Sequence, residues 1–371
     1  MGAYMDIPNE NNATITDSAF IAGINGAKPH RTPVWMMRQA GRSLPEYRAK
    51  RGIGSILDAL KDPSLACEIT LQPVARYDVD AAILYSDIIV PVHAAGFGVE
   101  IIPGKGPVTE KPFTRTADLA RLDNFDASRD TAYVMDTIKL LKKELKVPLI
   151  GFAGGPFTVA SYLIEGEPTR TFTKTRQFMN ENPDIFDQLL ERLTEITIDF
   201  LCNQISSGID AVQIFDSWVG ALNRTEYERF ISSHMKRIFA NETINSVPTI
   251  LFGVNTEPLL DLFAQSGPTA LGIDANTSIA ATTVRLGSTI ALQGNLDPTL
   301  CLTDSKTAVS GAHRVLVDSR NTPGYIFNLG HGVLPETDPE ILGEVVSYVH
   351  EHGRAIRDSA YETDEYRSAH A

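Results

Sequence analysis

The chain has 371 residues, of which 43% are hydrophobic and 21% are charged, and its 33 Lys and Arg against 46 Asp and Glu give a net charge of −13. This length admits one large barrel or two ordinary domains. The composition is that of a folded globular protein and not of a disordered or membrane chain. The negative charge argues against nucleic acid or anionic membrane as a partner, so an anionic ligand would need a local basic pocket.

The cysteines and the hydropathy pattern predict the compartment. Cys67, Cys202 and Cys301 are far apart in the sequence and form no C-x-x-C pair. This usage is typical of a reducing compartment without a disulfide framework. The first 30 residues lack a signal-peptide stretch, and no run approaches the roughly 20 apolar residues of a membrane span. We therefore expect a cytoplasmic protein that does not enter a membrane.

The order of the predicted elements is that of an alternating α/β domain. Residues 1–16 and 356–371 are polar and weakly periodic, and we expect flexible tails there on either side of one catalytic domain at 17–355. Short apolar, β-branched runs typical of buried parallel strands recur at 79–85, 147–152, 211–215, 249–252, 270–273, 290–293 and 325–327, with an eighth candidate at 34–37. Helical patterns between or after them cover 133–145, 185–205, 225–238 and 340–351.

About eight strands alternating with helices predict a single (β/α)8 barrel of the TIM type, with a doubly wound open sheet as the alternative. Polar residues follow successive strands, for example Asp87, Ser217 and Asn328 to His331. A barrel brings all these strand ends to one mouth, whereas an open sheet focuses ligands at a single switch point. The pattern therefore favours a barrel with its cleft at the carboxyl ends of the strands. Residues 97–114 read as a hairpin-like insertion in one of the loops.

Motifs for a resident cofactor are missing from the sequence. No G-x-G-x-x-G opens a helix, and the histidines and cysteines form none of the spacings that pair zinc ligands. We therefore expect chemistry without a metal or an organic cofactor.

An arginine-rich segment follows the candidate strand at 34–37. Arg38, Arg42, Arg48 and Arg51 fall within fourteen positions, and Gly41 lets the backbone turn closely past a ligand. Guanidinium groups present a planar fork that fits carboxylate oxygens. A solvated turn with surface ion pairs is the alternative reading of such a cluster.

Two long motifs of the chain resemble the signatures of the uroporphyrinogen decarboxylase family. Residues 33–42 read P-V-W-M-M-R-Q-A-G-R and match the pattern P-x-W-x-M-R-Q-A-G-R throughout, and residues 151–166 match a second pattern that follows a strand and opens a helix. Shorter likenesses at 85–88, 214–217, 293–297 and 328–332 extend the resemblance over about residues 17–355.

The resemblance implies a (β/α)8 enzyme, usually a homodimer, that converts uroporphyrinogen to coproporphyrinogen by removing four acetate carboxyls without metal or organic cofactor. It implies that Asp87, Arg38 and Arg42 are catalytic, with Asp87 beneath the pyrrole nitrogens. The implied substrate-binding set comprises Arg38, Gln39, Ala40, Gly41, Arg42, Arg51, Asp87, Tyr162, Ser217 and His331. Trp218 follows Ser217 where some relatives carry another residue.

Each of these residues also has a plain structural reading. Asp87 follows a strand and could cap a helix, Tyr162 could pack, Ser217 could cap, and His331 could satisfy a bond in the core. The functional reading rests on the chemistry of the substrate. A porphyrinogen carries its own electron sink, and a fixed carboxylate near its nitrogens stabilises the cation that develops during reaction. The group that donates the proton is left open.

Two other functions compete with this one. The first is a corrinoid-linked methyltransferase, which shares the barrel but binds zinc through His and Cys ligands that are missing here. The second is a tetrapyrrole carrier without turnover, against which Arg38 together with Asp87 argues, because a carrier gains nothing from a carboxylate matched to a transient cation.

Overall fold

The computed structural model describes residue 15 and residues 17–52, 54–102, 104–287 and 289–359. A parallel sheet of seven strands, in the order β1-β4-β5-β6-β7-β8-β9, forms its centre. The strands are β1 Ala82–Ile83, β4 Leu149–Gly154, β5 Ala211–Phe215, β6 Thr249–Phe252, β7 Ala270–Gly272, β8 Ala291–Gln293 and β9 Tyr325–Ile326. Each lies within or overlaps one of the seven apolar runs listed above, so those strand predictions are confirmed.

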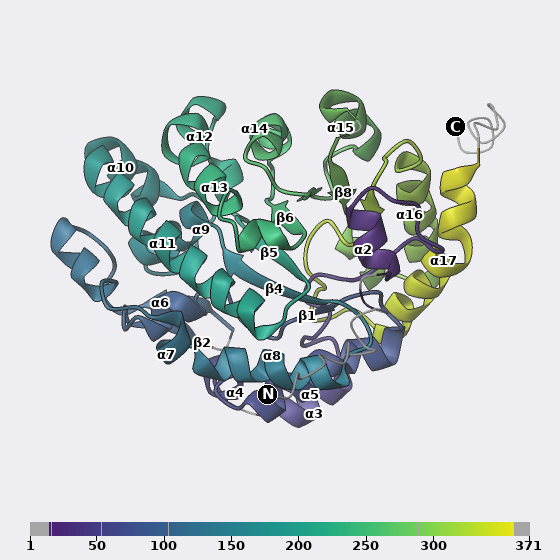
Figure 1. The fold of residues 1–371 in the computed structure, drawn as a ribbon, viewed down its shortest axis with the longest axis horizontal. Helices are drawn as coiled ribbons and strands as arrows, with labels where there is room; N and C mark the ends of the chain where they lie inside the picture. The colour runs from purple at the N-terminus through teal and green to yellow at the C-terminus, as the bar shows by residue number, and fades with distance from the viewer. Residues whose placement is uncertain (1–14, 16, 53, 103, 288, 360–371) are drawn as a thin grey trace, which may run out of the picture.

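Helices connect the strands and lie around the outside of the sheet (Figure 1). The α-helices are α2 Ala19–Ile24, α3 Pro45–Arg51, α4 Ile56–Leu60, α5 Pro63–Tyr77, α6 Val90–Ala94, α7 Ala127–Asp130, α8 Ala132–Glu144, α9 Pro156–Glu165, α10 Thr173–Glu181, α11 Pro183–Ser207, α12 Arg224–Phe230, α13 Ser232–Phe239, α14 Leu260–Gln265, α15 Ile279–Leu286, α16 Ser305–Asp318 and α17 Pro339–Asp358. Short 3-10 helices are η1 Thr116–Arg121, η2 Val219–Ala221, η3 Ile244–Ser246, η4 Glu257–Leu259 and η5 Pro298–Leu302.

Three of the four predicted helices are confirmed as α8, α11 and α17. The fourth, expected over 225–238, is two helices, because the backbone of Ile231 departs to φ −113° between α12 and α13. The insertion at 97–114 holds an antiparallel hairpin of β2 Val99–Ile102 and β3 Gly106–Thr109, as predicted. The expected tails lie largely outside the described residues, and α17 continues to Asp358.

The sheet curls strongly about its interior face. Gln293 on β8 donates from Nε2 to Oε1 of Gln213 on β5 at 2.9 Å, although β6 and β7 lie between these strands. Three strand spacings would separate them by about 14 Å in a flat sheet. Trp35 Nε1 joins the same group through a 2.9 Å bond to Gln293 Oε1. The strands β5 and β8 therefore face each other across a buried polar centre, around which the sheet curls.

The eighth strand expected at 34–37 is present only as an isolated parallel bridge between Val34 and Phe327. Side chains take the backbone donors that a strand ladder would use. Val34 N donates to Asp80 Oδ2 at 2.7 Å, and Met37 N donates to Asn328 Oδ1 at 2.9 Å. The segment nevertheless contacts both edges of the sheet, since Asp80 N bonds Val34 O and Trp35 N bonds Phe327 O.

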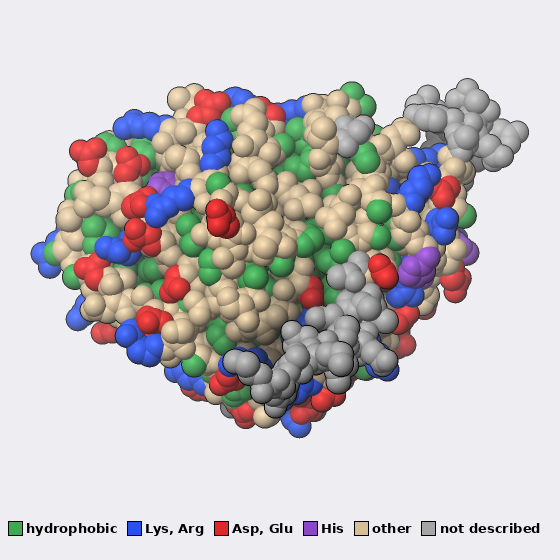
Figure 2. Space-filling model, in the orientation of Figure 1, with side chains coloured by type: hydrophobic (Ala, Val, Ile, Leu, Met, Phe, Trp, Pro, Cys, Tyr) green, Lys and Arg blue, Asp and Glu red, His purple; other side chains and the backbone are tan. Residues whose placement is uncertain are grey.

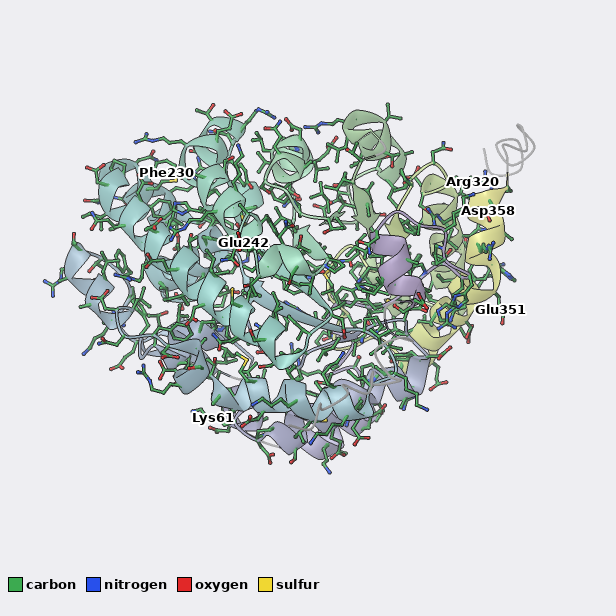
Figure 3. All side chains as sticks on the ribbon, viewed as in Figure 1. Lys61, Phe230, Glu242, Arg320, Glu351 and Asp358 are labelled. Atoms are coloured by element: carbon green, nitrogen blue, oxygen red, sulfur yellow. The ribbon has the colours of Figure 1, made fainter. Side chains whose placement is uncertain are left out.

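Charged side chains lie mostly at the rim of the face shown in Figure 2, and basic and acidic groups alternate there. Figure 3 shows side chains filling the space between the sheet and its helices, while the exposed Lys61 and Glu351 lie near the margin of this view. Within the described part of the chain, none of the helices combines the length and the apolar character needed to cross a bilayer.

Candidate active site

The predicted site residues follow the carboxyl ends of different strands. Asp87 lies after β1, Tyr162 in the helix after β4, Ser217 after β5 and His331 after β9, whereas Arg38 follows the bridge at Val34. Because the strands are parallel, their carboxyl ends all lie on the same side of the curled sheet. The topology therefore brings together residues that are up to 293 positions apart in the sequence.

The arginine turn is built by unusual backbone and a glycine contact. Arg38 has φ 61°, in the left-handed region that non-glycine residues rarely adopt, and its side chain is exposed. A Cβ added to Gly41 would stand 2.9 Å from Arg38 O, so the tight turn needs glycine there. Arg42 is also exposed, and Ala40 is half-buried. The turn thus presents two guanidinium groups to solvent.

Gln39 lies beneath this turn and is only 1% exposed. Its Oε1 accepts from Met36 N at 3.0 Å and its Nε2 donates to Ala81 O at 3.1 Å. The side chain therefore ties the turn to the start of β1 through both ends of its amide.

Arg38, Asp87, Tyr162 and His331 form an electrostatically coupled group. Burial raises the pKa of Asp87, while the Ile89 backbone bond and the charge of Arg38 act in the opposite direction. Burial also raises the pKa of Tyr162, with Asp87 adding to the effect and Arg38 opposing it. The pKa of His331 is lowered by burial and by Arg38. His331 is therefore neutral at neutral pH. The group then contains one guanidinium, that of Arg38, and one carboxyl, that of Asp87.

Asp87 has a structural bond in addition to its place in this group. Its Oδ1 accepts from Ile89 N at 3.0 Å and so stabilises the turn that leads into α6. The first residue of that helix is preceded by Ile89, which offers no capping side chain. The bond engages one carboxylate oxygen of Asp87, and it is compatible with a second role for the charge of this group.

An aromatic cluster borders the group on the α9 side. The rings of Tyr162 and Trp218 have centroids 3.9 Å apart at 32°, and Phe172 meets Trp218 edge-on at 5.1 Å. Ser217, next to Trp218, is half-buried. Phe172 is not among the predicted site residues, because an aromatic residue in a polar loop is its only signal in the sequence, and the packing of the Trp218 ring depends on tertiary structure.

A cavity of about 470 Å³ lies beside the arginine turn and is lined by Arg42, Tyr47, Arg48, Arg51, Gly52 and Pro335. Arg48 Nη1 donates to Arg42 O at 2.6 Å and thereby stabilises the backbone of the turn. Arg51 bonds Gly54 O, and its Nε has no hydrogen-bond partner among the described residues. Three positive side chains on one small cavity suit a carboxylate ligand.

The cavity connects to the loop that carries Asp87. Tyr47 and Tyr85 hydroxyls lie 3.1 Å apart, and Tyr85 is two residues before Asp87. Burial and the Tyr47 bond raise the pKa of Tyr85, and Arg51 and Asp87 both act on it. No group of three or more His, Cys, Asp and Glu side chains is placed to hold a metal among the residues with described positions.

Comparison with known proteins identifies the family of the chain. The family model for uroporphyrinogen decarboxylase matches residues 16–352. The chain is 48% identical over 336 residues to a uroporphyrinogen decarboxylase of Salinispora tropica, covering 90% of each chain. It is 47% identical to that of Mycolicibacterium paratuberculosis, covering 91% of this chain and 97% of the relative.

Among solved structures, a methyltransferase from Methanosarcina mazei superposes with a TM-score of 0.75 at 21% identity, covering 90% of this chain and 97% of the other. A B12-independent methionine synthase from Shewanella aligns with a TM-score of 0.55 at 10% identity, over 87% and 96% of the two chains. These structural likenesses concern the fold and not the chemistry. The family model and the identities over most of the chain show that it belongs to the uroporphyrinogen decarboxylase family.

Proposed function

We propose that the chain removes the acetate carboxyl groups of uroporphyrinogen III and yields coproporphyrinogen III and carbon dioxide. Family membership supports the reaction class. The observation that carries the assignment within this chain is the position of Arg38 at the strand ends, where its charge acts on Asp87, Tyr162 and His331. During the reaction the substrate has a cationic pyrrole ring and anionic carboxylates. A carboxylate stabilises the first, and a guanidinium binds the second.

In the proposed reaction, a proton adds to the pyrrole α-carbon and leaves an iminium-like cation on the ring. The bond to the acetate carboxyl then breaks, carbon dioxide departs, and its electron pair neutralises the ring. A proton adds to the exocyclic carbon, and the ring proton is lost. Asp87 stabilises the cation from beneath the ring nitrogens, and this stabilisation acts mainly in the transition state.

Arg38 and Arg42 hold the carboxylates of the substrate. The chain carries a net charge of −13, which repels an anionic ligand at long range. Local capture must therefore come from the exposed guanidinium groups of the turn and from the cavity that Arg51 and Arg42 line. Tyr162 and Ser217 contact the substrate from the aromatic side, and Gln39 acts by fixing the turn.

The finer architecture belongs to the same proposal. We infer that the segment around Val34 completes an eight-stranded barrel, which its backbone bonds to Phe327 and Asp80 support.

We further propose that the chain has a single catalytic domain at 17–355, forms a homodimer and is located in the cytoplasm. The family resemblance supports the dimer, and Cys67, Cys202 and Cys301, all free thiols, support a reducing compartment. Light scattering of the purified chain measures the oligomeric state.

The function is tested by incubating the purified enzyme with uroporphyrinogen III under anaerobic reducing conditions and separating the oxidised products by chromatography. We expect porphyrins with progressively fewer carboxyl groups, ending at coproporphyrin. Folded enzyme that returns only the starting porphyrin would overturn the proposal and leave the carrier function.

A further inference from the structure

Asp216 is a wholly buried carboxylate at the end of β5, with an exposed fraction of 0%. Its Oδ1 accepts from Thr158 N at 2.9 Å and from Thr158 Oγ1 at 2.6 Å, whereas Oδ2 has no hydrogen-bond partner among the described residues. Burial raises the pKa of Asp216 to about 6. A carboxylate placed this way is costly to keep in the interior of a protein.

Thr158 connects Asp216 to the loop that follows the strand. Its hydroxyl donates to Asp216 and accepts from Trp218 N at 3.0 Å. The side chain of Asp216 and the backbone N–H of Trp218, two residues later, therefore bond to the same hydroxyl. These two bonds fix the backbone of Ser217, which lies between them. We call Asp216, Thr158 and the Trp218 N–H the β5 clamp.

The β5 clamp needs glycine at position 155. A Cβ added to Gly155 would stand 2.4 Å from both Cβ and Cγ of Asp216 and 2.7 Å from its Oδ2. The carboxylate thus occupies space that only glycine leaves open at the start of α9. Capping of α9 by Asp216 accounts for the bond to Thr158 N, but it does not require the bond between the Thr158 hydroxyl and Trp218 N.

The β5 clamp continues into the aromatic cluster. Thr158 and Tyr162 are four residues apart on α9 and so lie on the same face of the helix. Trp218 is held at both ends, by its N–H on Thr158 and by its ring on Tyr162 at 3.9 Å between centroids. A shift of the loop after β5 would therefore move the ring that packs against Tyr162.

We propose that Asp216 is a positioning residue for the decarboxylation, which through Thr158 fixes the loop of Ser217 and Trp218 and so holds the Tyr162 phenol beside Asp87 and Arg38. The proposal rests on the proposed function only for the roles of Ser217 and Tyr162 toward substrate. The linkage from Asp216 to Trp218 is a property of the free enzyme and is measured without substrate.

The decisive variant is Thr158→Val, which keeps the shape of the side chain and removes the hydroxyl. Thr158→Ser keeps the hydroxyl and serves as the rescue. The matched control is Thr175→Val, because the Thr175 hydroxyl donates to another buried carboxylate, Glu165, at 2.9 Å near the far end of α9. The control removes the same chemical pair, here between α10 and the last residue of α9, and leaves the bond between Trp218 N and the Thr158 hydroxyl in place.

Acrylamide quenching of tryptophan emission reports the linkage. The chain has two tryptophans, and Trp35 is 0% exposed while Trp218 is half-buried, so quenching reports mainly Trp218. We expect roughly twofold steeper quenching in Thr158→Val and unchanged quenching in Thr158→Ser and Thr175→Val. Turnover in Thr158→Val should fall on the order of tenfold, mainly in kcat, because capture by Arg38 and Arg42 is untouched.

Quenching and turnover in Thr158→Val that match those of Thr175→Val would overturn the proposal and leave Asp216 as a helix cap. If the parent enzyme itself lacks turnover, the proposed function fails, while the quenching comparison still decides the linkage. Should Thr158→Val not fold, Trp218→Ala and Trp218→Phe replace it. We then expect loss of kcat in Trp218→Ala and retention in Trp218→Phe, and full activity in Trp218→Ala would contradict the proposal.

Discussion

The side chain of Arg38 lies across Gly332, so closely that a Cβ added to Gly332 would stand 2.3 Å from the Arg38 Cδ. Gly332 follows His331 after β9, whereas Arg38 follows the bridge at Val34. The contact therefore constrains the direction of the Arg38 guanidinium, which we propose binds substrate, from a residue nearly 300 positions away in the sequence.

This contact predicts the effect of Gly332→Ala. The methyl group displaces a flexible exposed side chain and not the backbone, so the melting temperature should change little while kcat/KM falls at least several-fold. Gly343→Ala is the matched control, since its Cβ would meet only Tyr77 Cδ1 at 3.9 Å. Equal kinetics in the two variants would show that the position of Arg38 does not matter.

Replacing Arg38 or Arg42 by lysine should lower kcat/KM, and replacing either by alanine should lower it further. Removing one partner of a desolvated charge pair costs about 2 to 5 kcal/mol, so alanine at either position should lower kcat/KM more than tenfold. Lysine keeps the charge but loses the planar fork and should restore only part of the activity. Arg129→Ala, at an exposed ion pair with Asp130, serves as the control. Near-normal kinetics in both alanine variants would favour a surface cluster.

Asp87→Asn separates the charge of Asp87 from its structural bond. Asparagine Oδ1 can still accept from Ile89 N, so the turn before α6 and the melting temperature should be preserved. The charge that stabilises the ring cation is lost, and kcat should fall by about 10² to 10³. Binding of substrate, measured directly, should weaken less. Parent-like turnover in the folded variant would reduce Asp87 to a capping residue.

Asp216 should make the protein less stable as the pH rises. Its pKa in the folded chain is about 6 against an ordinary 3.8, so between pH 4 and 6 the folded state binds more protons than the unfolded state. The free energy of unfolding of the parent, relative to Asp216→Asn, should therefore fall by roughly 2 to 3 kcal/mol between pH 4 and 7. Denaturant titrations of both proteins across this range measure the difference, and parallel curves would contradict it.

Activity should survive metal chelation and exhaustive dialysis. The described side chains offer no group of three or more metal ligands, and the substrate supplies its own electron sink. Turnover before and after treatment with a chelator is the measurement. A reversible loss of activity that zinc or another added metal restores would show that the proposed mechanism is incomplete.

The sequence by itself determined the seven strands of the sheet, the helices α8, α11 and α17, and the candidates for the site. Buried parallel strands such as β4 and β6 are continuous apolar runs, and such runs can be read locally. The motifs around Arg38 and Tyr162 identified the family on residues that are adjacent in the chain. Local patterns sufficed here because they depend on neighbouring residues only.

The tertiary structure decided how these residues act together. The donors of Val34 and Met37 bond Asp80 and Asn328 in place of a strand ladder, and these partners lie 46 and 291 positions away. The packing of Trp218 on Tyr162 and the buried contact between Asp216 and Thr158 likewise join separate segments. Periodicity and composition record which residues are buried, but which of them meet depends on how the sheet curls, and that is set by contacts across the whole chain.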